Sequence, residues 1–368
     1  MARNSWILRV LASLVVAASA APSASAIPAA VRAGYHVIHS YPNLTPPDSL
    51  FDLTKQGLVS GIILFGENVD SSNIANTKAV VKRFQSAWAA SPYYDGTPLL
   101  ILTDQEGGQV VRLPGGPVKS AKQIGQSSTP KAAAQTAGQD AAQACKAAGV
   151  NGNLAPVNGV YRKAGDFLDR YQRSFGNTSV LVTQCAPTFA KAQQAQGVVA
   201  TAKHFPGLGA AGTNENTDAN PVTINLSLDT LRTVDEVPFG NSIAAGVDMV
   251  MPSWAIYPAL DAKYPAGLST KWIQDELRGR LGFSGVTVSD AIEAGALSHG
   301  GFGANDGDRG VLATVAGMDL ILGSGRNATQ GKAIVQALVN GLASGKIDSA
   351  AFDAATSRIK ALRQKLTF

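Results

Sequence analysis

Eight segments rich in Val, Ile and Leu recur along the chain, separated by stretches with helical periodicity. They span residues 34–41, 61–66, 99–105, 150–157, 198–205, 247–253, 285–290 and 318–323. Several of them, such as GIILF, LLILTD and MDLILG, are apolar at consecutive positions, which is typical of strands buried on both faces. The intervening segments include 131–148, 180–196, 228–245, 270–281 and 329–343, and 344–368 is expected to form a final helix. Strand and helix therefore alternate throughout.

Alternation of this kind fits either a closed barrel or an open, doubly wound parallel sheet. Eight repeats fall within residues 27–368, and neither a Pro/Gly/Ser-rich linker nor a low-complexity segment divides them. A chain of this length is common for an α/β barrel that forms one domain. We therefore expect an α/β protein with a single-domain (β/α)8 barrel of the TIM type.

The first 26 residues have the pattern of a secretory signal peptide. Arg3 and Arg9 flank the start of an apolar stretch that runs to Ala18, and Ala24-Ser25-Ala26 follows as a cleavage signal. The apolar stretch is shorter than the roughly 20 residues of a membrane-spanning helix. We therefore expect a secreted protein without a membrane span, whose mature chain covers residues 27–368.

Charge and cysteine content limit the classes of partner and cross-link. The formal net charge is +5, and the Lys and Arg residues are scattered, which argues against a nucleic-acid partner. Cys145 and Cys185 could form one disulfide in an oxidising compartment or remain two buried thiols, and the sequence leaves both open. Sequons for N-glycosylation, relevant only in a host that glycosylates, begin at Asn43, Asn177, Asn225 and Asn327.

Candidate catalytic residues follow the strands, because barrel active sites lie at the carboxyl ends of the strands. Asp104 follows the third apolar segment, Lys203 and His204 end the fifth, and Asp290 ends the seventh. A charge at the end of an apolar strand is costly unless it faces a functional cavity. Asp290 could instead cap a helix that starts near residue 291. Together with Arg173, these side chains indicate a site that binds sugar hydroxyls and holds the carboxyl groups that glycoside hydrolysis needs.

The motifs themselves resemble glycoside hydrolase family 3, and within it the single-domain β-N-acetylhexosaminidases. They are GIILFGENV (61–69), TDQEGGQVVRLPG (103–115), RSFG (173–176), AKHFPGLG (202–209), LRGRLGFSGVTVSDAIEAGAL (277–297) and AGMDLIL (316–322). The resemblance covers essentially the whole mature chain. It implies a retaining exo-β-glycosidase that acts on terminal β-N-acetylhexosamine at the non-reducing ends of oligosaccharides or glycoconjugates.

The resemblance also assigns residues. Asp290 matches the nucleophile that forms a covalent glycosyl-enzyme. The positions that hold the hydroxyls of the terminal sugar are matched by Asp104, Arg112, Arg173, Lys203 and His204. Neither a metal nor an organic cofactor is implied.

One departure from the family concerns proton transfer. The single-domain hexosaminidases carry Asp-x-His after KHFPG, with the His as acid/base, but residues 207–218 contain no His. With Pro221 held in register, Glu215 falls on the Asp and Thr217 on the His. A Thr hydroxyl cannot act as a general acid and base at neutral pH, so the role passes to Asp218, or alternatively to Glu215. Asp218 could instead serve only in an Asx turn before Pro221.

Several other functions remain to be weighed. The missing His leaves open a non-catalytic or weakly active sugar-binding barrel, and Gln109, where the family commonly has Arg, leaves open a β-glucosidase-type specificity. Gly207-x-Gly-x-x-Gly212 formally fits a dinucleotide fingerprint, but Pro206 and the lack of a following helix start argue against it. No Gly-x-Ser-x-Gly elbow is present. The four His residues are dispersed, which argues against a zinc site.

Overall fold

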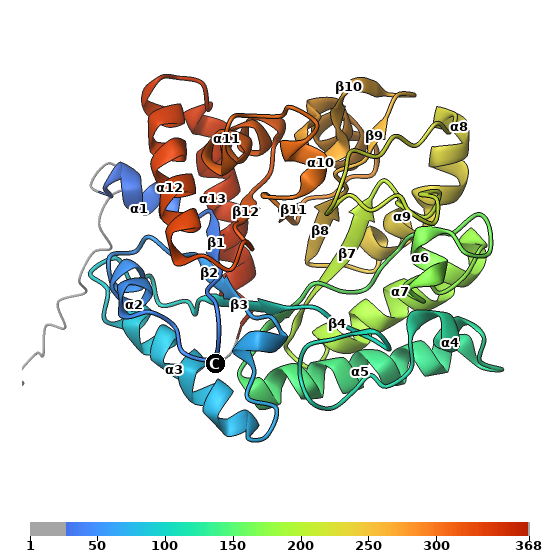
Figure 1. Cartoon of the computed structure of the whole chain (residues 1–368), viewed down its shortest axis with the longest axis horizontal. Coiled ribbons are helices and arrows are strands. Elements are labelled where there is room, and N and C mark those ends of the chain that lie inside the picture. The colour runs from blue at the N-terminus through green and yellow to red at the C-terminus, as the bar shows by residue number, and fades with distance from the viewer. Residues whose placement is uncertain (1–26, 367–368) are drawn as a thin grey trace, which may run out of the picture.

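The computed structural model describes residues 27–366 and has at its centre a closed barrel of eight parallel strands (Figure 1). The strands follow one another around the barrel in chain order, and β12 pairs with β1 to close it. Each strand overlaps one of the eight predicted apolar segments: β1 (Val37–His39), β2 (Gly61–Ile63), β3 (Leu100–Thr103), β6 (Gly152–Asn153), β7 (Val199–Phe205), β8 (Met249–Pro252), β11 (Val286–Ala291) and β12 (Leu320–Leu322). The prediction of a TIM-type barrel is confirmed.

The strands are buried on both faces, as their composition predicted. Leu100 and Leu102 of β3 belong to the cluster of apolar side chains inside the barrel, together with Ile38 and Met249. Ile101, one residue away, packs in a separate cluster with the helices outside. Successive side chains of a strand point to opposite faces, so a strand with apolar packing on both sides must be apolar at every position.

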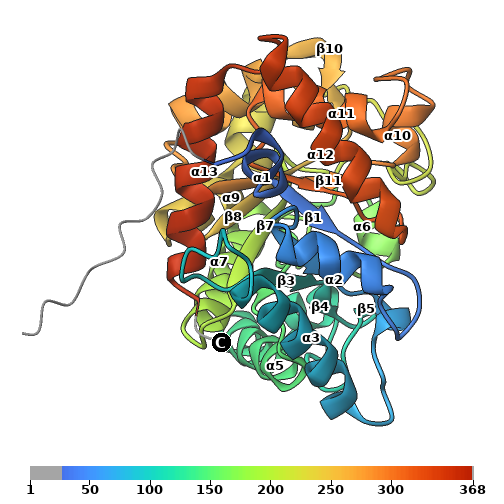
Figure 2. The same ribbon diagram turned by 90° about the vertical axis from the view of Figure 1, so that its left-hand side faces the viewer.

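Helices surround the barrel, as Figures 1 and 2 show. The longer ones are α2 (Asp48–Lys55), α3 (Ile74–Ala89), α5 (Pro130–Ala148), α7 (Ser179–Gln194), α9 (Val237–Ala244), the π-helical η5 (Lys271–Arg280), α11 (Asp306–Ala316), α12 (Ala328–Ala343) and α13 (Ser349–Gln364). Shorter turns are α1 (Ala29–Gly34), α4 (Ala121–Gly125), α6 (Phe167–Arg170), α8 (Leu228–Thr230), the π-helical η3 (Leu231–Asp235), α10 (Gly295–Ser298) and the 3-10 turns η2 (Gly66–Asn68) and η4 (Ala266–Leu268). Two small antiparallel pairs, β4 (Gln105–Gly107) with β5 (Val110–Val111) and β9 (Ile256–Tyr257) with β10 (Asp261–Pro265), lie outside the barrel.

Two predicted helices have different limits in the structure. The segment 228–245 is divided into α8, η3 and α9, and Pro238 lies at the start of α9. Proline has no N–H to donate and fits best in the first turn of a helix, which is where Pro238 lies in α9. Pro187 lies inside α7, so a proline does not by itself end a helix in this fold. The final helix begins at Ser349 instead of residue 344. Gly345 has a φ of +72°, which a helix cannot continue through, and the Asp348 carboxylate caps α13 by accepting from the Ala351 N–H at 2.7 Å.

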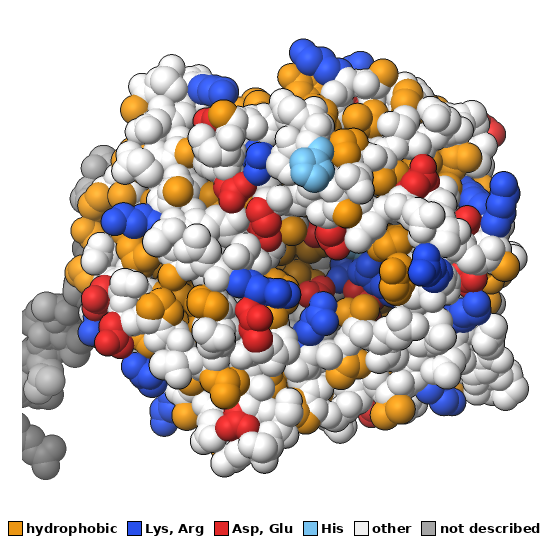
Figure 3. Space-filling view, in the orientation of Figure 1, with side chains coloured by type: hydrophobic (Ala, Val, Ile, Leu, Met, Phe, Trp, Pro, Cys, Tyr) orange, Lys and Arg blue, Asp and Glu red, His pale blue; other side chains and the backbone are white. Residues whose placement is uncertain are grey.

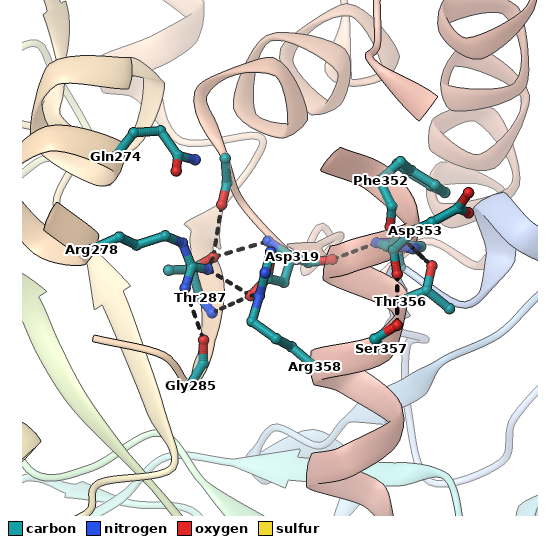
Figure 4. Close-up of polar contacts among 12 residues, drawn as sticks. Gln274, Arg278, Gly285, Thr287, Asp319, Phe352, Asp353, Thr356, Ser357 and Arg358 are labelled. Carbon is teal, nitrogen blue, oxygen red and sulfur yellow. Dashed lines mark hydrogen bonds and ion pairs between the residues drawn. The ribbon is translucent and has the colours of Figure 1, made fainter. Parts of the chain in front are cut away.

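The amino-terminal end of the barrel is held by a buried ion cluster around Asp319, which precedes β12 (Figure 4). Its carboxylate accepts hydrogen bonds from Arg278 at 2.8 Å, from Arg358 at 2.6 and 3.0 Å and from the Thr287 N–H at 2.9 Å. These residues come from η5, α13 and β11. The cluster therefore ties β11 and β12 to the helices that cover this end.

Cys145 and Cys185 are both buried and form no disulfide. The four sequon asparagines are exposed. No helix within residues 27–366 is both long enough and apolar enough to cross a bilayer. The expected signal peptide lies outside the described residues.

Candidate active site

A cavity of about 480 Å³ opens at the carboxyl ends of the barrel strands, where Figure 3 shows a hollow with acidic and basic side chains close together. Its apolar floor includes Ile63, Met251 and Leu322, at or near the ends of β2, β8 and β12. The charged residues that line it are Asp104, Glu106, Arg112, Arg173, Lys203, Asp218, Asp290, Glu293 and Arg326. Every predicted site residue except Glu215 lines this cavity.

Four of these side chains form an alternating chain of charges. Lys203 Nζ lies 2.8 Å from Asp104 Oδ1 and 2.8 Å from Glu106 Oε1. Arg173 donates two hydrogen bonds to Glu106, at 2.9 Å from Nε and 2.8 Å from Nη2. The side chains of Lys203 and Glu106 are only 2% and 5% exposed. Buried charges are stable only when each is paired, and here each has at least one opposite charge in direct contact.

The pairing keeps these groups ionised. Burial opposes the charged form of Glu106, but the guanidinium of Arg173 and the ammonium of Lys203 outweigh it and hold the pKa of Glu106 far below its ordinary value. Burial likewise opposes the charged form of Lys203, and the carboxylates of Asp104 and Glu106 nevertheless raise its pKa. The cavity wall therefore presents fixed charges and donors suited to sugar hydroxyls.

Asp290 lies near the end of β11 with its side chain at the cavity. Its Oδ1 accepts a hydrogen bond from the Ala291 N–H at 2.8 Å, and its Oδ2 is 3.9 Å from Nε2 of His204. Burial and the negative charge of Asp218 together raise the pKa of Asp290 to about 7. Burial, Arg173 and Lys203 hold the pKa of His204 well below 6.5, so this imidazole is neutral at pH 7.

The loop that follows β7 brings Asp218 and Thr217 to the cavity but not Glu215. Glu215 is exposed, and its Oε2 accepts from the Gly212 N–H at 2.5 Å within the loop. Thr217, at the position of the expected His, is 3% exposed. The Asx turn here is made by Asn216, whose Oδ1 accepts from the Asp218 N–H at 3.0 Å, so the Asp218 carboxyl is not used in that turn.

Arg112 reaches the cavity from the strand pair β4–β5. The side-chain amide of Gln105 shapes this hairpin: Oε1 accepts from the N–H groups of Arg112 and Leu113 at 2.9 and 3.0 Å, and Nε2 donates to the carbonyl of Gly116 at 2.9 Å. The buried amide thus fixes the backbone from which Arg112 projects.

Three charged residues of the cavity were missed by the sequence analysis: Glu106, Glu293 and Arg326. Glu293 accepts hydrogen bonds from the Ser324 hydroxyl at 2.6 Å and from Gln330 at 3.0 Å. The Arg326 guanidinium lies 4.7 Å from the centre of the Phe65 ring. Glu106 could have been predicted from the sequence. Residues two apart in an extended chain point to the same side, and Asp104 was already expected at the site.

No group of three or more His, Cys, Asp and Glu side chains among residues 27–366 is arranged to hold a metal ion. Within the described part of the chain, neither the Asp290 nor the Asp218 carboxyl is in direct contact with a Lys or Arg side chain. The Asp290 carboxyl has the neutral imidazole of His204 as a neighbour, with 3.9 Å between Oδ2 and Nε2. A cavity with hydroxyl-binding groups and two such carboxyls can supply both the nucleophile and the proton donor of glycoside hydrolysis.

Comparison with known proteins agrees with this geometry. The family model described as the glycosyl hydrolase family 3 N-terminal domain matches residues 40–362. The chain belongs to glycosyl hydrolase family 3. The predictions of the family and of a carbohydrate-hydrolysing enzyme are confirmed.

Relatives of this family 3 protein include a secreted one. A protein of Arthroderma benhamiae, named an uncharacterized secreted glycosyl hydrolase, is 56% identical over 352 residues, which cover 96% of this chain and 98% of the relative. This match confirms the prediction of a secreted glycoside hydrolase. A β-hexosaminidase of Stenotrophomonas maltophilia is 34% identical over 316 residues, which cover 79% of this chain and 86% of the relative.

Solved structures share the fold. A family 3 β-N-acetylglucosaminidase from Paenibacillus sp. superposes with a TM-score of 0.84 at 32% identity over 92% of this family 3 chain, which spans 63% of that protein's length. A β-N-acetylhexosaminidase from Beutenbergia cavernae gives a TM-score of 0.81 at 30% identity, covering 92% of this chain and 99% of that one.

Proposed function

We propose that this family 3 glycoside hydrolase removes terminal β-linked N-acetylhexosamine from the non-reducing ends of oligosaccharides or glycoconjugates, with Asp290 as the nucleophile. The observation that carries the proposal is the position of the Asp290 carboxyl in the cavity, with Oδ2 near His204 and with the Asp104–Lys203–Glu106–Arg173 charges beside it. The names of the Stenotrophomonas, Paenibacillus and Beutenbergia proteins support the choice of sugar.

In the proposed first step, an Asp290 carboxylate oxygen forms a bond to the anomeric carbon while the bond from that carbon to the leaving oxygen breaks. Asp218 gives its proton to the leaving oxygen. Lys203, Arg173 and Asp104 hold the sugar hydroxyls, and Arg112 lies at the rim of the same cavity. The neutral imidazole of His204 can donate a hydrogen bond to a hydroxyl without adding a charge.

In the second step, Asp218 takes a proton from water as the water oxygen attacks the anomeric carbon and the bond to Asp290 breaks. Each displacement inverts the configuration at the anomeric carbon, so after two of them the product keeps the β configuration. Asp218 is preferred to Glu215 because Asp218 lines the cavity and its charge acts on Asp290, whereas Glu215 does not line the cavity.

The first experiment compares wild type with Asp290→Ala on an aryl β-N-acetylglucosaminide that has an activated leaving group. Such a leaving group needs little protonation, so wild type is expected to cleave it even if acid catalysis is weak, and Asp290→Ala is expected to lose the activity. Equal rates of cleavage by the two proteins contradict the role of Asp290, and absence of cleavage by wild type favours a sugar-binding barrel without catalysis.

The second experiment identifies the sugar. A panel of aryl β-glycosides that differ only at the second carbon of the sugar is expected to show the highest kcat/KM for the N-acetylamino compound. β-Glucosides are the second candidate, because Gln109 departs from the Arg common in the family, and a higher kcat/KM for the glucoside than for the N-acetylamino compound would contradict the proposed sugar.

A further inference from the structure

Two loops from different strands meet at the rim of the cavity. One is the segment 207–218 after β7, which carries Asp218, and the other leaves β11 just after Asp290 and leads into α10. The Gly295 N–H donates to the Asp218 carbonyl at 2.8 Å, and the Ala296 N–H donates to the Thr217 carbonyl at 3.0 Å. The first N–H groups of a helix have no partner inside it, so these two are available to hold a neighbouring segment.

Gly295 lets the two segments approach this closely. A Cβ at this position would lie 1.9 Å from the carbonyl oxygen of Ala219 and 2.4 Å from its carbonyl carbon. Both are backbone atoms, which cannot move aside as the end of a flexible side chain can. Any larger residue must therefore push the segment 217–219 away from α10 by roughly an ångström or more.

The other end of the segment 207–218 is fixed independently. The Thr213 hydroxyl donates to the Gly165 carbonyl at 2.7 Å, and the Phe167 N–H donates to the Ala211 carbonyl at 3.0 Å. Leu208 and Ala211 are buried in the apolar cluster that also contains Phe167. Of the anchors described here, the contact with α10 is the one next to Asp218 itself.

We infer that Gly295 is a positioning residue for proton transfer: by docking the Thr217 and Asp218 carbonyls on α10, it holds the Asp218 carboxyl at a fixed place relative to Asp290. The inference rests on the proposed role of Asp218 as acid/base. A proton donor must lie within hydrogen-bond reach of the leaving oxygen, and a misplacement of about 1 Å can cost about 100-fold in rate. Attack by Asp290 on an activated substrate does not depend on this placement.

The test is the dependence of kcat/KM on the leaving group in Gly295→Ala, measured with an activated aryl glycoside and with an unactivated alkyl glycoside or disaccharide. For the unactivated substrate, kcat/KM is expected to fall by about 10-fold to 100-fold. For the activated substrate, kcat/KM is expected to change by less than about 3-fold. A second variant, Ala296→Pro, removes the other N–H donor at a helix position that accepts proline and is expected to act in the same direction. Rates are divided by the folded fraction from near-UV circular dichroism.

Gly240→Ala is the matched control. Gly240 lies in α9, and a Cβ there would have the Leu281 side chain as its nearest neighbour, at an ordinary van der Waals distance of 3.7 Å. Its rates are expected to equal those of wild type on both substrates. Asp218→Asn, measured in parallel, separates the two hypotheses. If Asp218→Asn spares the unactivated substrate, the acid/base assignment itself is wrong. Suppose instead that Asp218→Asn lowers kcat/KM for the unactivated substrate. If Gly295→Ala and Ala296→Pro then lower kcat/KM equally for both substrates, or for neither, the positioning role of Gly295 is wrong.

Discussion

Glu106 connects two of the cations that line the cavity, Arg173 and Lys203, and its carboxylate is almost fully buried. Its two oxygens accept from Arg173 and contact Lys203, while Lys203 also contacts Asp104. Without Glu106, two buried cations would share the single carboxylate of Asp104. The ordering of Arg173 and Lys203, which are proposed to bind sugar hydroxyls, therefore depends on the carboxylate of Glu106.

Glu106→Gln keeps the size of the side chain and removes its charge. We expect a loss of about 3 kcal/mol in the free energy of unfolding, because breaking one side of a buried ion pair leaves its partners uncompensated. A fall in kcat/KM is expected with it, because Arg173 and Lys203 lose their fixed orientation. Urea unfolding and steady-state kinetics measure the two effects.

Asp353→Asn serves as the control for that variant. Asp353 pairs with Arg32 at 2.6 Å, but its side chain is 60% exposed, and exposed pairs contribute at most about 1 kcal/mol. Similar losses in the free energy of unfolding in the two variants would show that the buried ion pairs of Glu106 stabilise the protein no more than an exposed pair does.

In the proposed mechanism the carboxyl of Asp290 must be ionised to attack, so its pKa is expected to set the acid limb of the kcat/KM profile. Burial, Asp218 and Asp104 raise that pKa, while the Ala291 N–H and Lys203 lower it. Asp218→Asn removes a negative neighbour, so the pKa of Asp290 falls and the acid limb, near pH 7 in wild type, is expected to move to lower pH. The profile is measured on an activated substrate.

The same substitution at Glu215 distinguishes the two loop carboxyls. Glu215 lies outside the cavity, and Glu215→Gln is expected to leave the acid limb in place. A shift in Glu215→Gln with none in Asp218→Asn would reverse the assignment of the acid/base.

Among the elements, β11 and β12 depend on the Asp319 cluster at the amino-terminal end of the barrel. The Asp319 side chain is fully buried and bonded to two guanidinium groups and to the Thr287 backbone. Asp319→Ala is expected to lower the free energy of unfolding by about 3–5 kcal/mol, as for other buried pairs that lose one partner. The change is measured by denaturant unfolding.

Activity distinguishes a local from a general effect of that substitution. Asp319 lies three residues before Leu322, which lines the cavity, and a strand advances roughly 10 Å over that distance. The folded fraction of Asp319→Ala is therefore expected to keep the kcat/KM of wild type. A selective loss of activity without loss of stability would contradict the structural role.

Local sequence was sufficient for the barrel strands but not for every helix boundary or loop. The strands were predictable because burial on both faces leaves continuous apolar runs such as residues 61–65. The start of a helix at Pro238 could have been anticipated, because proline is favoured in the first turn of a helix, whereas Pro187 shows that a proline can also lie inside one. The choice between Asp218 and Glu215 could not, because it depends on contacts with α10, some 80 residues away in the chain.

At the scale of the whole molecule, the barrel brings together residues from positions 63 to 326 because parallel strands end on the same rim. The same folding buries both cysteines. Burial raises the pKa of each thiol to about 12, so neither is reactive in the folded protein. Cys145 packs in the cluster that contains Val81 and Phe84 of α3, and Cys185 packs in the cluster that contains Ala137 and Ala141 of α5, so each thiol becomes available only when these contacts open.

Thiol titration of the purified protein without added reductant tests this arrangement. The folded protein is expected to react slowly or not at all, and both thiols are expected to react in guanidinium. Complete absence of reactive thiol after unfolding would show that Cys145 and Cys185 are joined by a disulfide instead.

The central claim is that the Asp290 carboxylate bonds to the anomeric carbon. A fluorinated N-acetylglucosaminyl fluoride forms the glycosyl-enzyme quickly and releases it slowly, and peptide mass spectrometry then locates the sugar. We expect a single sugar on the peptide that contains Asp290, with no label in Asp290→Ala. A sugar attached to another residue, or turnover of the reagent with no trapped intermediate, would contradict the claim.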